Sequence, residues 1–302
     1  MAMFNAVAAR VAALAVAASA ASLGWCAPGA KGSDAIVEVP SIRPVIRAVP
    51  GLDEPLVALQ PPSAEEDRAL DRALGAYQSA SGTGDAVVRA RSLVAFLTAY
   101  PASTWRMSVL TNLGMAYYRD GYFSRAIDAW RDAWVAGREA TSPEAAAIRS
   151  RAVGELARMH ARVGHADALE QLFADLGDQA VSGSATEMIT GAREGLWMFR
   201  NDPGRSYLCG PMALRSLMVE LGSTDEQVRP ISEERSGPRG YTLAQVSALA
   251  ERLGLSYALI HRKPGQPVPV PSIINWNVSH FAAVVERSGD RYRIKDPTFA
   301  TG

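Results

Sequence analysis

Hydrophobic and polar positions follow two different periods along this chain. From about residue 63 to 199, apolar residues recur every three to four positions among Ala, Arg and Glu, which predicts a succession of amphipathic helices. After Arg200 the segment NDPG ends this helical pattern. Two further helical stretches follow, and after them come short runs of residues typical of strands. Helices followed by an antiparallel sheet predict an α+β fold, with an all-α domain at 63–199 and an α+β domain at 200–302.

Part of the helical stretch has the character of an internal repeat. In SVLTNLGMAYYRDGYFSRAIDAWRDAWVAG, small and aromatic residues recur on two consecutive helices joined at a glycine. This spacing resembles the tetratricopeptide repeat, in which small residues let paired helices approach and aromatic residues fill the gap. The positions are Leu113, Gly114, Tyr117, Gly121, Ala126, Trp130 and Ala133. A weaker copy runs from Leu156 to Phe173, and a generic helical bundle is the alternative interpretation.

The segment SYLCGPMALRSLMVELG carries a cysteine where a helix is predicted to begin. Apolar residues at helical spacing follow Cys209, Pro211 suits the first turn, and Gly222 suits the position just after the helix. Unsatisfied N–H groups and the helix dipole favour negative charge at such a start, and they lower the pKa of a thiol there.

One more helix and a set of strands are predicted after this segment. The stretch GYTLAQVSALAERLG has a capping box formed by Thr242 and Gln245, and Gly254 follows its end. Strands are predicted over residues 255–262, 271–277, 280–287 and 291–296.

The last two strands are predicted to form a hairpin that brings a histidine close to an aspartate. A three-residue loop over residues 288–290 places Ala282 opposite Asp296. His280 and Asp296 are then diagonal neighbours on one face of the sheet, roughly 7–8 Å apart at the backbone. A two-residue loop would place them on opposite faces, so this expectation depends on the register.

A thiol, an imidazole and a carboxylate in this order suggest nucleophilic catalysis. The carboxylate would orient the imidazole, and the imidazole would deprotonate a thiol at a helix start. Each residue also has an ordinary structural interpretation. Cys209 could be an inert buried thiol, His280 could end a strand, and Asp296 before Pro297 could be a turn residue. We favour the catalytic interpretation because all three features occur together.

Residues 201–302 resemble the papain-like bacteriocin-processing peptidases, family thirty-nine of the cysteine peptidases, which remove double-glycine leader peptides. The matching blocks are CGPMALRSLM, GYTLAQVSALAERLGL, SIINWNVSHFAAVVE and RYRIKDPT. The resemblance implies a papain-like α+β domain with Cys209 as nucleophile, His280 as general base and Asp296 as the orienting residue. The function that it implies is cleavage of a peptide bond in a peptide or protein substrate.

Two features depart from that family. Its members usually carry a glutamine six residues before the cysteine, which donates to the oxyanion, whereas this chain has Pro203 there. Losing one such donor costs roughly 2.7–4 kcal/mol of transition-state stabilisation. The alternatives are therefore a catalytically impaired pseudopeptidase that binds peptides or proteins, and a related amidase or transamidase. Members of that family are often fused to an ABC transporter, whereas this chain carries the predicted helical repeats, which we expect to hold a substrate or a protein partner. Because family members continue with more sheet after the aspartate strand, we also expect the sheet to continue beyond Gly302.

Composition narrows the choice of partners and cofactors. The 302 residues include 31 basic and 31 acidic side chains, and this balance gives no electrostatic reason to expect nucleic acid binding. Two cysteines do not make a disulfide scaffold, and the four histidines are not spaced to share a metal ion with Cys209. A glycine-rich phosphate loop is missing from the sequence. We therefore expect no cofactor, no metal and no nucleotide.

The N-terminus MAMFNAVAARVAALAVAASAASLGWCAPGA has the layout of a secretory signal peptide. Arg10 precedes an apolar segment, and small residues follow it. We expect a signal peptide at 1–22, a Pro-rich linker at 23–62, and an exported bacterial protein that is periplasmic or extracellular. One alternative is a transmembrane anchor, for which the segment is short. The other is lipid attachment at Cys26, against which Trp25 counts because the preceding position requires a small residue.

Overall fold

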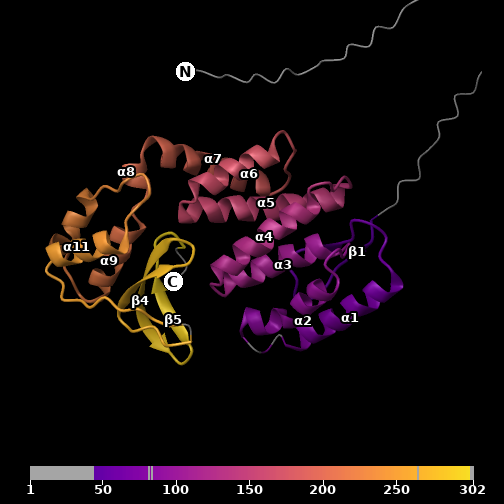
Figure 1. The fold of residues 1–302 in the computed structure, drawn as a ribbon, viewed down its shortest axis with the longest axis horizontal. Helices are drawn as coiled ribbons and strands as arrows, with labels where there is room; N and C mark the ends of the chain where they lie inside the picture. The colour runs from indigo at the N-terminus through magenta and orange to yellow at the C-terminus, as the bar shows by residue number, and fades with distance from the viewer. Residues whose placement is uncertain (1–43, 81, 83, 264, 300–302) are drawn as a thin grey trace, which may run out of the picture. The chain divides into compact units, whose positions relative to one another are not determined.

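The structure, a computed structural model, describes residues 44–299 except 81, 83 and 264. Over these residues the protein is mostly helical and has a small C-terminal antiparallel sheet, so the predicted α+β class is confirmed (Figure 1). None of the described helices combines the length and the apolar character needed to cross a membrane. The expected signal peptide at 1–22 and the lipid-attachment alternative at Cys26 lie outside the described residues.

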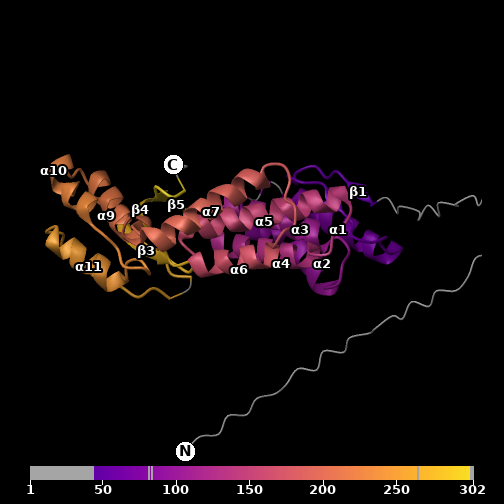
Figure 2. The same ribbon diagram turned by 90° about the horizontal axis from the view of Figure 1, so that it is seen from above.

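The predicted helical stretch from residue 63 to 199 forms helices whose ends follow local capping rules. Ser63, Asp85 and Ser142 each cap a helix N-terminus by accepting a backbone N–H through the side chain. Helices α3, α4 and α5 lie side by side (Figure 2). The helices are α1 (Ala64–Ser79), α2 (Ala86–Ala99), α3 (Arg106–Arg119), α4 (Phe123–Gly137), α5 (Pro143–Val163), α6 (Ala166–Leu176) and α7 (Ala185–Asn201).

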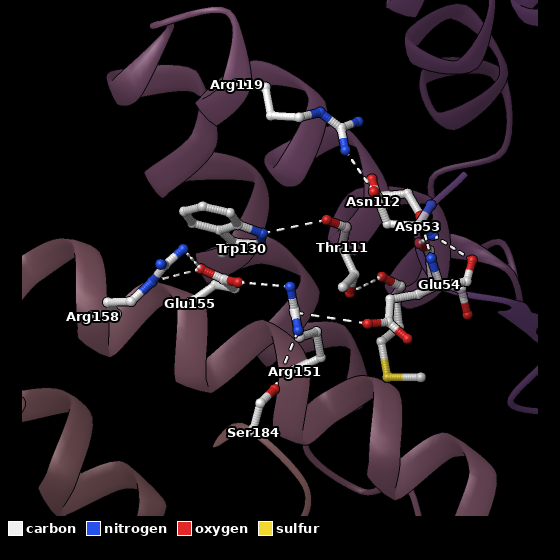
Figure 3. Close-up of polar contacts among 12 residues, drawn as sticks. Asp53, Glu54, Thr111, Asn112, Arg119, Trp130, Arg151, Glu155, Arg158 and Ser184 are labelled. Atoms are coloured by element: carbon white, nitrogen blue, oxygen red, sulfur yellow. Dashed lines mark hydrogen bonds and ion pairs between the residues drawn. The ribbon is translucent and has the colours of Figure 1, made fainter. Parts of the chain in front are cut away.

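Gly114 in α3 allows α3 and α4 to approach closely. A Cβ atom at this position would lie 2.3 Å from Nε1 of Trp130, a side chain that is only 1% exposed. The same indole N–H donates to the carbonyl of Thr111 at 3.3 Å (Figure 3). The indole therefore has no room to move away from a larger residue.

Replacing Gly114 by alanine is expected to destabilise the protein by about 1–3 kcal/mol, because overpacking in a filled core forces side chains and backbone to shift. Gly75 in α1 is the matched control, since a Cβ there has no heavy atom within 4 Å. Gly75→Ala should stabilise the protein by roughly 0.5–1 kcal/mol through lower backbone entropy in the unfolded chain. Urea unfolding of both variants measures the difference, and equal midpoints would contradict the close approach.

A polar network joins α3, α5 and the segment before α1 (Figure 3). The Glu155 carboxylate in α5 is 3% exposed and pairs with both Arg151 and Arg158. Arg151 also lies 3.7 Å from a carboxylate oxygen of Glu54. The side-chain oxygen of Asn112 accepts the backbone N–H of Glu54 at 2.9 Å. The segment before α1 is thereby held against the helices.

The sequence predicts an extended linker at 23–62, but the described part of this segment, from residue 44 onward, is folded against the helices. Two short strands, β1 (Ile46–Arg47) and β2 (Leu56–Val57), pair with each other, and Leu56 is fully buried. The Ser108 hydroxyl in α3 bonds both the N–H and the carbonyl of Val57. Prolines in this segment predict an extended chain, but buried hydrogen bonds to α3 tie it down instead.

The C-terminal part places two main helices against one face of a three-stranded sheet in the order β3-β4-β5. The predicted capping box of Thr242 and Gln245 is confirmed, and Gly254 follows with φ +75°. The elements are α8 (Pro203–Ser206), α9 (Cys209–Glu220), α10 (Asp225–Val228), the 3₁₀ helix η2 (Arg229–Glu233), α11 (Leu243–Arg252), β3 (Ser272–Trp276), β4 (His280–Ser288) and β5 (Arg291–Lys295).

The strand predicted at 255–262 was wrong. This segment is irregular, and the side chains of Leu259 and Ile260 are 62% and 60% exposed. Apolar, β-prone residues predict a strand from sequence, yet a strand forms only where a partner supplies hydrogen bonds. In the described sheet, β3 pairs with β4 alone.

Candidate functional site

Cys209 is the first residue of α9, as the sequence predicts. Leu214 and Met218, on the buried side of this helix, anchor it in the core with α11. A Cβ atom on Gly210 would lie 2.7 Å from Val246 in α11, so glycine is required where the two helices meet. The packing holds the start of α9, and with it the thiol, in a fixed place beside the sheet.

The β4–β5 hairpin reaches the predicted register by a different route. Ser288 pairs with Arg291, so the loop has two residues and not the predicted three. A β-bulge between Val284 and Glu286 then shifts the register by one residue, so that Ala283 lies opposite Lys295. This is the pairing that a three-residue loop without a bulge would have produced. The bulge therefore cancels the effect of the shorter loop.

His280 and Asp296 consequently meet in a buried ion-pairing contact. Nε2 of His280 lies 2.7 Å from Oδ2 of Asp296, and their side chains are 2% and 4% exposed. The other carboxylate oxygen accepts the backbone N–H of Thr298 at 2.9 Å, which fixes its orientation. Burial alone lowers the pKa of His280, but the hydrogen bonds with Asp296 and Cys209 outweigh it and raise the pKa to about 9.

The thiol of Cys209 lies beside His280 and forms a hydrogen bond with it. Burial raises the pKa of this thiol, but hydrogen bonds from His280 and from the backbone N–H of Phe281 favour the thiolate more strongly. The net result is a pKa below the ordinary value for cysteine. Because Nε2 of His280 carries the proton shared with Asp296, Nδ1 is the ring atom left to exchange a proton with sulfur. The cysteine is free and partly exposed, so a reagent can reach it.

The positions that the sequence offers for a side-chain oxyanion donor are Pro203 and Asn201. Pro203 lies in α8 and supplies only its carbonyl, which accepts from the Ser236 hydroxyl at 2.9 Å. The Asn201 amide, a possible substitute, donates to the carbonyl of Trp197 at 2.8 Å. Cys209 is the first residue of α9, so its backbone N–H has no intrahelical acceptor and is a candidate donor to an oxyanion.

The helices before residue 200 contribute a wall next to His280, which the sequence analysis missed. Phe123 of α4 stacks on Trp276 at 4.7 Å and on Phe299 at 4.3 Å between ring centroids. Phe299 in turn meets the His280 ring edge-on at 5.5 Å. Arg162 of α5 lies over the Phe299 ring at 5.8 Å. No local pattern signals the contacts of Phe123 and Arg162, because their partners lie more than 100 residues away in the chain.

His165 at the start of α6 makes a polar contact in the same region. Its Nε2 lies 2.9 Å from the carbonyl oxygen of Val278, in the loop that leads into β4. The Val278 side chain is 5% exposed and belongs to the hydrophobic core of the helices. The loop before His280 is therefore held by α6 and by the helical core together.

The residues expected to act together do lie together in the structure. Cys209 comes from a helix start, His280 from the first position of β4, and Asp296 from the residue after β5. The resemblance to family-thirty-nine peptidases rests on the four sequence blocks that surround these residues. Comparison of the chain with models of protein families, with curated proteins and with solved structures finds no match.

Proposed function

We propose that this protein is a cysteine peptidase that uses Cys209, His280 and Asp296. The observation that carries the proposal is the buried 2.7 Å contact between His280 and Asp296 beside a thiol whose pKa is lowered. A structural histidine does not need a buried carboxylate on one side and a partly exposed thiol on the other. This combination is what a nucleophile, a base and an orienting group require.

In the proposed reaction the imidazole holds the proton of the thiol and returns it to the leaving group. The thiolate attacks the carbonyl carbon of the substrate, and the N–H of Cys209 donates to the developing oxyanion. As the C–N bond breaks, Nδ1–H of His280 protonates the leaving amine and a thioester remains. Water then attacks the thioester while His280 takes its proton. The C–S bond breaks, the free acid leaves, and the thiol is restored.

We propose that the helices bind the substrate or a partner in the manner of tetratricopeptide repeats. The contact of Gly114 with Trp130 supports this likeness. A cavity of about 480 Å³ lies between α2, α3 and α4, and it offers both apolar and charged side chains. Its lining includes Leu97, Arg106, Leu113, Tyr117, Arg125 and Asp128.

A peptide-binding pseudopeptidase is the second candidate, and Pro203 is the observation that favours it. If the missing side-chain donor limits turnover, Pro203→Gln is expected to raise kcat by about 10²–10³-fold, which is what one oxyanion donor contributes. Cleavage of a peptide library, read by mass spectrometry, measures this. Cys209→Ala is the control, and it should abolish all cleavage. A wild-type protein and a Pro203→Gln variant that both cleave nothing, while the thiol stays reactive, would favour the binding function.

A further inference from the structure

Two histidines meet at the junction of α5 and α6. His160 lies in the last turn of α5, and His165 is the residue before α6. Gly164 between them has φ +75°, a conformation that turns the chain sharply and brings the rings together. Their Nδ1 atoms are 3.0 Å apart. Both side chains are half-buried.

The hydrogen bonds of this histidine pair define its protonation. The Val278 carbonyl only accepts, so Nε2 of His165 must carry a proton. In the neutral pair, Nδ1 of His165 is then an acceptor and Nδ1–H of His160 donates to it. One added proton is tolerated, because His165 can then donate from Nδ1 to a bare nitrogen of His160. A second added proton places N–H against N–H at 3.0 Å, which the pair cannot accommodate.

His165 of this pair contacts the loop from Asn277 to Ser279, which joins β3 to β4, at the carbonyl of Val278. Ser279 has φ +55°, a conformation that non-glycine residues rarely adopt and that surrounding contacts must maintain. Its N–H donates to the carbonyl of Trp276 at 2.9 Å. His280 follows directly, so the position of its backbone depends on this loop.

The surroundings of the pair disfavour added protons. Burial, followed by the charges of His165 and of Arg131 in α4, lowers the pKa of His160 to about 4. Burial also lowers the pKa of His165. The hydrogen bond with the Val278 carbonyl opposes this effect, and the charge of His280 in β4 adds to it. Arg131 and His280 are thus the cationic groups that face the pair from the packed elements. Both histidines of the pair are neutral near pH 7.

We propose that His165 is a positioning residue for His280, and that full protonation of the His160–His165 pair releases the loop at Asn277–Ser279 and disengages the reacting histidine. The regulatory part of this inference rests on the proposed peptidase function. The release of the loop does not, because it depends only on contacts outside Cys209.

The direction of the pH effect follows from linkage. In the closed state the loop at Asn277–Ser279 is held by His165, and in the open state it is released. Histidines whose pKa is depressed in the closed state stabilise that state at pH values above the ordinary histidine pKa of about 6.5. This contribution is lost as the pH falls from about 6.5 through the value of about 4 for His160. Each additional proton bound by the open state changes the opening equilibrium about tenfold per pH unit. Loop opening is therefore expected to rise steeply between pH 6 and pH 4.

Amide hydrogen exchange of the full chain carrying Cys209→Ser tests the release without thiol chemistry. The probe is the peptide that contains Ser279, with rates corrected for the intrinsic pH dependence of exchange. Protection should fall more than tenfold from pH 7 to pH 4.5. In His165→Gln it should stay high at both pH values, because the glutamine N–H can still donate to Val278 but does not titrate. His261→Gln, which alters an exposed histidine, should behave as the parent.

Alkylation of Cys209 by iodoacetamide in otherwise native protein tests the link to the site. His165→Gln should react as fast as wild type at pH 7 and several-fold faster at pH 4.5. Equal protection at both pH values in the parent, or the same fall in His165→Gln, would overturn the release of the loop. Loop release with identical alkylation profiles would overturn the positioning role. Peptide cleavage that fails while exchange behaves as expected would count against the proposed function alone.

Discussion

Replacing His280 by alanine is expected to slow alkylation of Cys209 by iodoacetamide at pH 6 by about 10- to 100-fold. A thiol with an ordinary pKa of about 8.5 is less than about 1% ionised at this pH, and only the thiolate reacts. In the folded protein a hydrogen bond and the charge of His280 lower the pKa of the thiol. Removing the imidazole leaves a buried sulfur with no counter-charge, so its pKa should rise above the free value.

The pH dependence of alkylation should differ between the wild type and His280→Ala. The pKa of His280 is raised to about 9, so the ring keeps its proton through neutral pH and loses it only near that value. The thiolate–imidazolium pair is therefore stable between the lowered pKa of the thiol and about pH 9. Alkylation should be nearly constant across this window in the wild type. The advantage over His280→Ala should shrink above about pH 9, where the imidazole loses its proton and the thiol of the variant begins to ionise.

Matched variants separate the roles of the three residues. Cys209→Ser should abolish labelling at position 209, which peptide mapping distinguishes from labelling at Cys26. Asp296→Asn should slow the labelling of Cys209 less than His280→Ala does, since the amide keeps a hydrogen bond to the ring but not its charge. His261→Ala removes an exposed histidine and serves as the control. Labelling that is slow at pH 6 and the same in His280→Ala as in wild type would remove the dyad, and the catalytic proposal with it.

Replacing Glu155 by glutamine is expected to lower the free energy of unfolding by about 2–3 kcal/mol. The change removes the buried negative charge that Arg151 and Arg158 share, and breaking a fully buried pair costs about 3–5 kcal/mol. The side chains of these arginines are 27% and 32% exposed, so water compensates part of the loss. Urea denaturation followed by circular dichroism measures the change.

An exposed glutamate provides the comparison for this network. Glu187 in α7 lies at the surface, so Glu187→Gln should change the stability by less than about 0.5 kcal/mol. Replacing Glu155, Arg151 and Arg158 together by apolar residues of similar size should recover most of the loss, because the buried carboxylate is removed together with both of its partners. The Glu54 carboxylate then loses Arg151, but its side chain is 26% exposed to water. A Glu155→Gln variant as stable as Glu187→Gln would show that the network contributes nothing net.

Several parts of the fold were predictable because their causes are local. The start of α9 at Cys209, its end before Gly222, and the capping box of Thr242 and Gln245 depend on residues within one or two helical turns. Such capping contacts can be identified from the order of residue types alone. The irregular segment at 255–262 shows the limit of this reasoning, because a strand requires a neighbouring strand, and the local sequence does not indicate whether one is present.

The hairpin of β4 and β5 shows how a correct expectation can rest on an incomplete reason. A loop of two residues alone would have separated His280 from Asp296, and the bulge between Val284 and Glu286 brings them back to one face. Bulges depend on the packing of both sheet faces and have no reliable local signature. The sequence order of the three residues was therefore a better guide to the site than the counting of strand positions.

Most element types, the α+β class and the candidate trio of Cys209, His280 and Asp296 follow from periodicity, capping and the order of chemical groups, so they could be predicted from the residue order alone. The contacts of Phe123 and His165, in the helical part, with the loop and rings around His280 could not be predicted in this way. Residues so far apart in the chain meet because both bury apolar surface in one shared core. The positions of such contacts are set by the packing of whole elements, which no local pattern records.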